Sequence, residues 1–310
     1  MLSQVAERLY WFARYVERTE NIARLILVRH QLALDLPKKI QPEWRVITDM
    51  LGVGEEFDKQ RKAPSEKNVV SFMFGDKENP SSILSSIIQA RENMRTSREV
   101  LPTEVWERLN SLYLSVIRRA GKEFPRSVRH KILNQIIQSC QQISGALLGT
   151  MNHDDSYQFI ILGRNLERSD MSTRIIDVGT AQLSGDEDYI TPYRNVLWMS
   201  ILRSLSAYQM YRLNMKTNVS REAVLEFVLQ GEVFPRAVGR CLKEIHESTS
   251  QLPNNRSVIK AVKDCKQRLD TKELLQFRGE QLHLFIDELQ ADLGSIHDAI
   301  FTTWLHPVRE

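Results

Sequence analysis

The chain has 310 residues, of which 42% are hydrophobic, so it is a globular protein that can bury a substantial core. Its 42 Lys and Arg residues nearly balance 39 Asp and Glu residues, and no basic block or tail stands apart, so charge gives little support for nucleic-acid binding. The 13 glycines form no GxxxxGK[ST], and GVG at 52–54 has Phe57 in place of the third glycine of GxGxxG, so no nucleotide cofactor is expected by these routes.

The apolar residues of almost every long segment recur with helical period, and no alternating strand pattern appears, so an all-α protein is expected. Proline and serine mark the helix starts, and Pro37 follows the end of the first helix. The polar segment 52–68 is predicted to be a mobile loop, and the acidic segment 184–192 a turn. Helices are expected at about residues 3–34, 81–100, 102–120, 125–149, 156–183, 193–213, 221–230 and 234–246, with two long helices between 256 and 305.

No Pro/Ser linker divides these helices, so we expect one domain over residues 1–310. Charges interrupt the apolar face of the first twenty residues, and about 18 uncharged apolar residues never occur in a row, so neither export nor a membrane span is expected. Cys140, Cys241 and Cys265 have no CxxC spacing and are odd in number, which indicates reduced, buried thiols in a cytoplasmic protein.

One charged pattern occurs twice, in ARYVERTENIARL at 13–25 and in GRNLERSDMSTRI at 163–175. At a constant offset of 150, Arg14, Glu17, Arg18, Thr19, Glu20 and Arg24 correspond to Arg164, Glu167, Arg168, Ser169, Asp170 and Arg174. The offset is compatible with a duplicated half-domain. However, the halves show little similarity outside the motif, which favours a single large multi-helix bundle.

The two copies differ in their surroundings. On a helical wheel the charges of the first copy gather on one side, so they could form a solvated face. In the second copy apolar residues surround Arg164 and Glu167, which predicts burial, and a buried ion needs a partner because its isolation costs several kcal/mol. The natural partner is the other copy, so the two motif helices are predicted to pack together.

Such a cluster has a structural and a functional interpretation. Its ion pairs could fix only the helix register. Alternatively, the surplus of arginine over carboxylate suits a carboxylate or phosphate on a ligand. The candidate binding residues are Arg14, Glu17, Arg18, Arg24, Arg164, Glu167, Arg168, Asp170 and Arg174, with Arg91 and Glu92 from a further charged patch at 90–99. If the cluster performs chemistry, Glu17 or Glu167 would transfer the proton.

A carboxylate-bridged metal bundle requires two Glu-x-x-His helices. The chain offers one match, Glu280 to His283 with Asp287 one turn later, and the second match is missing, so no metal site is expected. His153, Asp154 and Asp155 are interpreted as a cap of the following helix.

Several segments resemble a known family in the same order along the chain. They are YWFARYVERTENIARL, NPSSILSSIIQARENMRTSREVLPTEVWERLNSLYL, LGRNLERSDMSTRIIDV, and SLSAYQMYR with VLEFVLQGEVFPRAVGRCL. They are similar to the bacterial alpha-E domain proteins, which are all-helical and named for a Glu-Arg motif. The resemblance implies a circularly permuted ATP-grasp ligase as partner, because family members are typically encoded beside one or fused to it, often near a transglutaminase-like protein. It carries over no catalytic residue.

This resemblance and the missing phosphate loop together suggest a helical partner that leaves nucleotide activation to the ligase. Its Arg/Glu cluster would recognise an acidic amino acid or peptide, or dock the ligase. Two alternatives stay open: an enzyme that uses a buried Glu in amide or peptide modification, and a scaffold without a small-molecule site.

Overall fold

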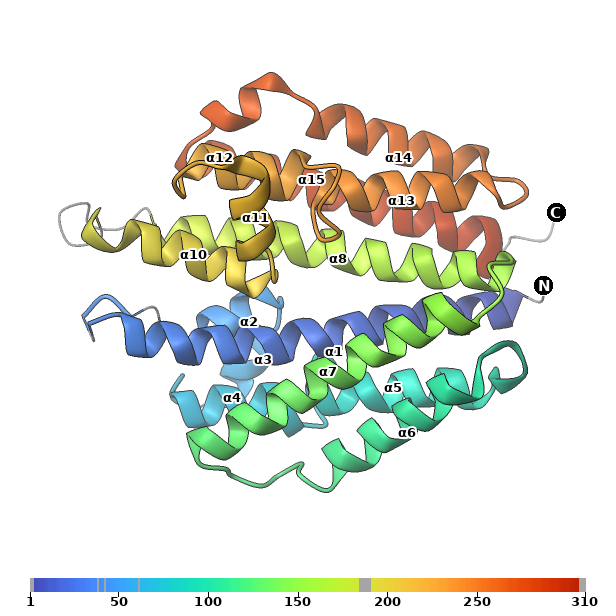
Figure 1. Cartoon of the computed structure of the whole chain (residues 1–310), viewed down its shortest axis with the longest axis horizontal. Helices are drawn as coiled ribbons and strands as arrows, with labels where there is room; N and C mark the ends of the chain where they lie inside the picture. The colour runs from blue at the N-terminus through green and yellow to red at the C-terminus, as the bar shows by residue number, and fades with distance from the viewer. Residues whose placement is uncertain (1–2, 38, 42, 61, 184–190, 307–310) are drawn as a thin grey trace. The chain divides into compact units, whose positions relative to one another are not determined.

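The computed structural model describes residues 3–37, 39–41, 43–60, 62–183 and 191–306. Within these ranges the regular elements are all helices, which confirms the all-α prediction (Figure 1). The main helices are α1 Ser3–Asp35, α2 Val46–Met50, α3 Gly54–Lys59, α4 Glu66–Gly75, α5 Ile83–Arg95, α6 Thr103–Ile117, α7 Arg126–Thr150, α8 Asp155–Gln182, α10 Arg194–Ser204, α11 Tyr208–Met215, α12 Arg221–Leu225, α13 Val238–Ser250, α14 Arg256–Leu269 and α15 Gly279–Ile300. Short 3-10 turns and two π-helical turns, Glu226–Gln230 and Phe301–Leu305, complete the set.

The chain divides into two compact units. Unit 1 comprises residues 1–30 and 43–163, and unit 2 comprises residues 31–42 and 164–310. Two of the boundaries fall inside α1 and α8, and the third lies between α1 and α2, so no Pro/Ser linker separates the units along the chain.

Unit 1 contains most of α1, the helices α2 to α7 and the first turns of α8. Helix α5 packs against α4 and α6, and α6 packs against α7. Local chemistry sets the helix starts, because Ser65 and Ser82 each cap a helix by accepting a hydrogen bond from a backbone N–H three residues later. An Asn79 turn precedes the second of these caps, since its side-chain oxygen accepts from the backbone N–H of Ser81 at 2.9 Å. Helix α5 therefore begins slightly later than predicted.

The predicted loop at 52–68 is wrong for residues 54–59, which form α3, and for residues 66–68, which begin α4. Phe57 is fully buried and its ring contacts that of Phe72 edge to face, with 5.3 Å between the centroids. Burial of a phenyl ring contributes roughly 1.5–3 kcal/mol, which is enough to order a short polar helix that has little intrinsic stability. The polar composition of the segment did not indicate that Phe57 would be buried and would hold the helix in place.

Unit 2 contains the rest of α8 and the helices α10 to α15, with α14 packed against both α13 and α15. The predicted helix 193–213 is interrupted, because Ser206 has a φ of 55° and separates α10 from α11. Leu205 and Ala207, on either side of it, are both buried. Packing of these neighbours therefore overrides the helical periodicity. The predicted turn 184–192 lies mostly outside the described residues.

The three cysteines, all within the described residues, are buried thiols that form no disulfide, as predicted. Burial raises the pKa of the Cys265 thiol to about 12, so this side chain behaves as a small apolar core residue. Across the described part of the chain, none of the helices combines the length and hydropathy that crossing a bilayer requires.

Candidate functional site

The first copy of the charged motif lies on α1, in unit 1. Glu17 and Glu20 are each 3% exposed and Asn21 is 2% exposed. The interpretation of this helix as a solvated charged face is therefore wrong. The arginines of this helix are more exposed than its carboxylates, because Arg14, Arg18 and Arg24 keep part of their surface accessible to solvent.

The second copy lies on α8, in unit 2, and shows the same difference in exposure between carboxylates and arginines. Glu167 is 1% exposed, whereas Arg164, Arg168 and Arg174 are partly exposed. In each copy the carboxylate of the Glu-Arg pair is thus withdrawn from solvent and the guanidinium groups stay nearer the surface.

The repetition extends to the contacts inside each helix. Arg24 Nη2 lies 2.6 Å from Glu20 Oε1, and 150 residues later Arg174 Nε lies 3.0 Å from both carboxylate oxygens of Asp170. Likewise the hydroxyl groups of Thr19 and Ser169 each donate to the backbone carbonyl one turn earlier, at 2.8 and 3.0 Å. The two motifs are therefore equivalent in local structure as well as in sequence.

The environments of the two ion pairs are not equal. Glu20 also accepts a 3.5 Å hydrogen bond from Gln141, and its pair with Arg24 is almost fully buried, with exposures of 3% and 14%. The Asp170 and Arg174 side chains are 23% and 33% exposed. Because a buried pair resists separation more than a solvated one, the first pair should matter more to stability.

Aromatic rings hold the arginines of the first copy in place. The Arg14 guanidinium lies over the rings of Trp11 and Tyr10, 5.2 and 5.8 Å from their centroids, and Arg18 lies 5.7 Å from the ring centroid of Tyr15. Stacking restricts the planar guanidinium without consuming its in-plane N–H donors. Arg14 Nη1 also donates to the Tyr10 hydroxyl group at 3.4 Å, so this side chain is held by both contacts.

A residue that the sequence analysis did not select brings α1 and α8 together inside unit 1. A Cβ on Gly163 would lie 2.2 Å from the carbonyl oxygen of Tyr10, so the two backbones are in direct contact there. Gly163 directly precedes Arg164, and Tyr10 lies one turn before Arg14. The available signal was a glycine in the middle of a helix in a glycine-poor chain, which often marks a close backbone approach.

Arg91 and Glu92 lie on α5. Arg91 donates its Nε–H to Asn110 at 3.0 Å and lies 4.6 Å from the ring centroid of Tyr113, both on α6. Glu92 is 46% exposed and pairs with Arg95 on its own helix. These contacts hold the patch between α5 and α6.

The sequence-predicted Glu-x-x-His helix is α15, and the structure adds a residue to it. His283 Nδ1 lies 2.8 Å from Asp177 on α8, and Nε2 lies 3.5 Å from Asp287. The hydrogen bond to Asp177, followed by its negative charge, raises the pKa of His283. These three side chains are of metal-ligating types, but two of them are more than half exposed and the hydrogen bond accounts for their arrangement.

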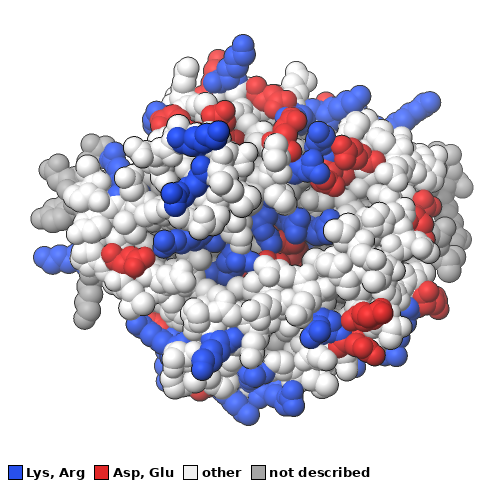
Figure 2. Space-filling view, viewed as in Figure 1, with Lys and Arg blue, Asp and Glu red and all other residues white. Residues whose placement is uncertain are grey.

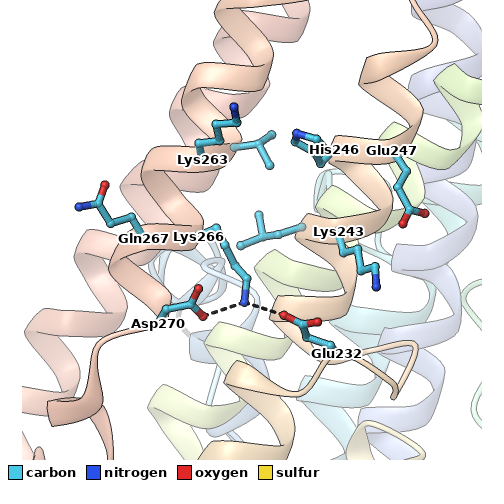
Figure 3. A pocket seen from close by; sticks show the side chains of 10 residues that line it. Glu232, Lys243, His246, Glu247, Lys263, Lys266, Gln267 and Asp270 are labelled. Atoms are coloured by element: carbon cyan, nitrogen blue, oxygen red, sulfur yellow. Dashed lines mark hydrogen bonds and ion pairs between the residues drawn. The ribbon is translucent and has the colours of Figure 1, made fainter.

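A groove of about 600 Å³ lies between α13 and α14 in unit 2. Leu242 and Val262 form its apolar floor. Figure 3 shows Lys266 between Asp270 and Glu232, at 2.7 and 3.1 Å, which closes one end. Burial alone would lower the pKa of Lys266, but these two contacts raise it. Lys266 therefore stays protonated, and the two carboxylates balance its positive charge. None of the motif residues lines this groove.

Charge is distributed in small groups on the surface as well. Figure 2 shows Lys and Arg side chains interspersed with Asp and Glu side chains on the face in view. The fold and these side chains together define the class of protein: an all-helical protein in which an Arg/Glu motif occurs twice.

The chain belongs to the Alpha-E family, described as a predicted alpha-helical domain with a conserved ER motif, whose model matches residues 1–305. It is also similar to the uncharacterized proteins Mb2597 of Mycobacterium bovis and MT2643 of Mycobacterium tuberculosis, with 21% identity over 336 residues in each case. The similarity covers 97% of this chain but only 37% of each relative, so the chain spans little more than a third of their length. No solved structure matches the chain.

Proposed function

We propose that the chain is a helical partner of an ATP-grasp-type amide or peptide ligase system, and that its motif arginines recognise an acidic amino acid or peptide. The observation that carries the proposal is the gradation within each motif: Glu17 and Glu167 are 3% and 1% exposed, while the neighbouring arginines stay partly accessible. Glu20 and Asp170 hold Arg24 and Arg174, and guanidinium groups held in place bind a ligand carboxylate with a smaller entropic cost.

The ligase as partner rests on the family resemblance and on the lack of a phosphate loop in the sequence. A component without its own nucleotide site needs another protein to activate a carboxyl group with ATP. The mycobacterial relatives support a partner role indirectly, because in them the matching region is part of a longer chain.

Thermal unfolding tests the ligand directly. The purified protein is titrated with glutamate, aspartate and short acidic peptides, with glutamine and sodium chloride as controls for charge and ionic strength. A ligand at a hundred times its Kd stabilises the folded state by about 2.7 kcal/mol, which raises the Tm of a chain of this size by roughly 5 °C. Arg18→Gln and Arg168→Gln should remove most of that shift.

Arg118→Gln is the matched control for these variants. Arg118 is exposed, and its Nε donates only to the carbonyl of Leu114 at the end of its own helix. This variant loses the same charge and should retain the full shift. If Arg118→Gln weakens the ligand as much as Arg18→Gln does, the effect is nonspecific attraction and the proposed site is wrong.

Docking of the ligase is the second role that the same arginines suit. Co-purification of the ligase without a shift from any acidic ligand would favour docking, and loss of the complex in Arg18→Gln would assign the contact. Complex formation unaffected by Arg18→Gln and Arg168→Gln, together with no thermal shift, would leave a scaffold that uses another surface.

Catalysis by the motif is tested with Glu17→Gln and Glu167→Gln. Each substitution keeps the side-chain volume and removes the ionisable group, so it separates proton transfer from packing. Protein, ligase and ATP are combined with candidate amines and acids. Loss of product with an intact fold and complex would indicate catalysis, and unchanged product would exclude it for that residue.

A further inference from the structure

A pocket of about 400 Å³ in unit 1 lies between α4 and the start of α7, away from both motif copies in the sequence. One part of its lining is apolar and includes Val70, Phe74, Phe124 and Ile132. The charged part contains Glu66, Arg126 and Arg129, together with Lys122 and the exposed pair of Lys67 and Glu123 at 2.8 Å. A cavity with an apolar wall and a few convergent charged groups is typical of small-molecule sites.

The charged part is organised around one carboxylate. Glu66 accepts from Arg126 Nε at 3.0 Å, and it also contacts Arg126 Nη2 and Arg129 Nη2. His30 Nε2 lies 3.0 Å from the same carboxylate. Burial tends to raise the pKa of Glu66, but the Arg126 hydrogen bond and the nearby positive charges hold it below the usual value. Glu66 is therefore ionised and fixes both arginines.

Positive charge nevertheless exceeds negative charge at this carboxylate. Arg29 is 6% exposed and is close enough for Glu66 to raise its pKa, although burial, the larger effect, lowers that pKa to about 10. Its Nε and Nη1 have no hydrogen-bond partner among the described residues, and its guanidinium lies 5.2 Å from the ring centroid of Trp44. Three arginines thus share a single glutamate.

His30 does not alter this balance at neutral pH. Burial first, and the charge of Arg129 second, lower the pKa of His30 to about 4 despite the adjacent carboxylate. The imidazole is therefore neutral at pH 7 and donates one N–H to Glu66. The cluster of three arginines and one glutamate keeps a net charge of +2.

The N-terminus of α7 adds to the positive potential. Arg126 is the first residue of this helix of 25 residues, and Pro125 at the N-cap offers no side chain to accept from the first backbone N–H groups. These N–H groups carry the positive end of the helix dipole. Both Pro125 and Arg126 line the pocket, so the dipole and the guanidinium groups act on the same space.

We propose that this pocket binds a small organic anion, whose carboxylate or phosphate group lies against Arg126, Arg129 and the start of α7. The apolar body of the ligand would contact Phe74 and Phe124. Glu66 is then a positioning residue, because it holds both arginines in place before the ligand arrives. The inference uses none of the motif residues, so it stands independently of the proposed function.

Isothermal titration with four probes tests the site in the full chain. Benzoate and phenyl phosphate carry the same ring and distinguish the two head groups, acetate removes the ring, and benzyl alcohol removes the charge. We expect benzoate or phenyl phosphate to bind at least about tenfold more tightly than acetate, and benzyl alcohol not to bind measurably, since both the head group and the ring contribute. Equal binding of benzyl alcohol and benzoate would overturn an anion site.

Arg126→Gln and Lys131→Gln provide the matched variants. Arg126 is 60% exposed, so its loss should not unfold the chain, whereas Lys131 is an exposed residue of the same helix that does not line the pocket. Loss of a charge-assisted hydrogen bond should weaken benzoate about tenfold or more in Arg126→Gln, with less than about a twofold change in Lys131→Gln. Equal weakening in both variants, or no binding of any anion to the native protein, would refute the proposal.

Discussion

Replacing Gly163 with alanine should destabilise the protein, although alanine is the better helix former. In the native structure the added Cβ would lie 2.2 Å from the carbonyl oxygen of Tyr10 and 3.0 Å from its carbonyl carbon. An unstrained carbon–oxygen contact is about 3.3 Å or longer, so the two backbones would have to separate by about 1 Å. No side-chain rotation can relieve the contact, because both partners are main chain.

The magnitude follows from two opposing effects. Overpacking of a well-packed site costs about 1–3 kcal/mol, and a contact between two backbones belongs near the upper end of this range. Alanine in a helix interior gains about 1 kcal/mol over glycine. The net expectation is a loss of about 2 kcal/mol in the free energy of unfolding, which lowers the Tm by roughly 3–4 °C.

Gly145→Ala is the control for helix propensity. Gly145 is exposed on α7, and a Cβ there would meet nothing within 4 Å, so the substitution should stabilise the chain by up to about 1 kcal/mol. Thermal and urea unfolding of both variants are followed by circular dichroism. If Gly163→Ala is as stable as the native protein, or gains as much as Gly145→Ala, the inferred contact between α1 and α8 does not exist in solution.

Three further outcomes are expected. Glu20→Gln should lower the free energy of unfolding by about 3 kcal/mol because it leaves Arg24, which is only 14% exposed, without its counter-ion. Asp170→Asn at the more exposed pair should cost less than about 1 kcal/mol. Equal losses in urea unfolding would contradict the difference in burial. Phe57→Ala should cost about 3–5 kcal/mol, as expected for a fully buried ring, and a loss below about 1 kcal/mol would restore the loop interpretation of this segment. The folded-state pKa of His283 is raised, chiefly by Asp177, so its stabilising contribution is complete below the unfolded pKa of about 6.5 and is lost as the pH rises through the folded pKa. The stability difference between native protein and His283→Gln should therefore shrink from pH 6 to pH 9, and a difference that is constant over this range would argue against the contact.

The sequence was sufficient for the helical class and for the approximate position of most long helices. Periodic apolar residues, serine caps and prolines act over a few residues, so their effect is readable without the rest of the chain. The same reasoning explains why the repeat in sequence became a repeat in structure. The pairs Glu20 with Arg24 and Asp170 with Arg174 are each four residues apart on one helix, a spacing that places side chains together by helix geometry alone.

Tertiary packing decided what lies further apart in the chain. The wheel of α1 suggested a solvated face, but Glu17 is buried because the burial of a helix face depends on its neighbours and not on its own pattern. Likewise, residues 54–59 form a helix because Phe57 is buried. That burial depends on distant residues, so the local sequence could not predict it.

By itself the sequence determined an all-helical chain with two equivalent Arg/Glu motifs, since both properties arise from interactions within single helices. Only the tertiary structure revealed the backbone contact at Gly163 and the group of His30, Glu66, Arg126 and Arg129 around one pocket. The physical reason is that these residues come from distant segments, and their side chains meet only after the chain has folded.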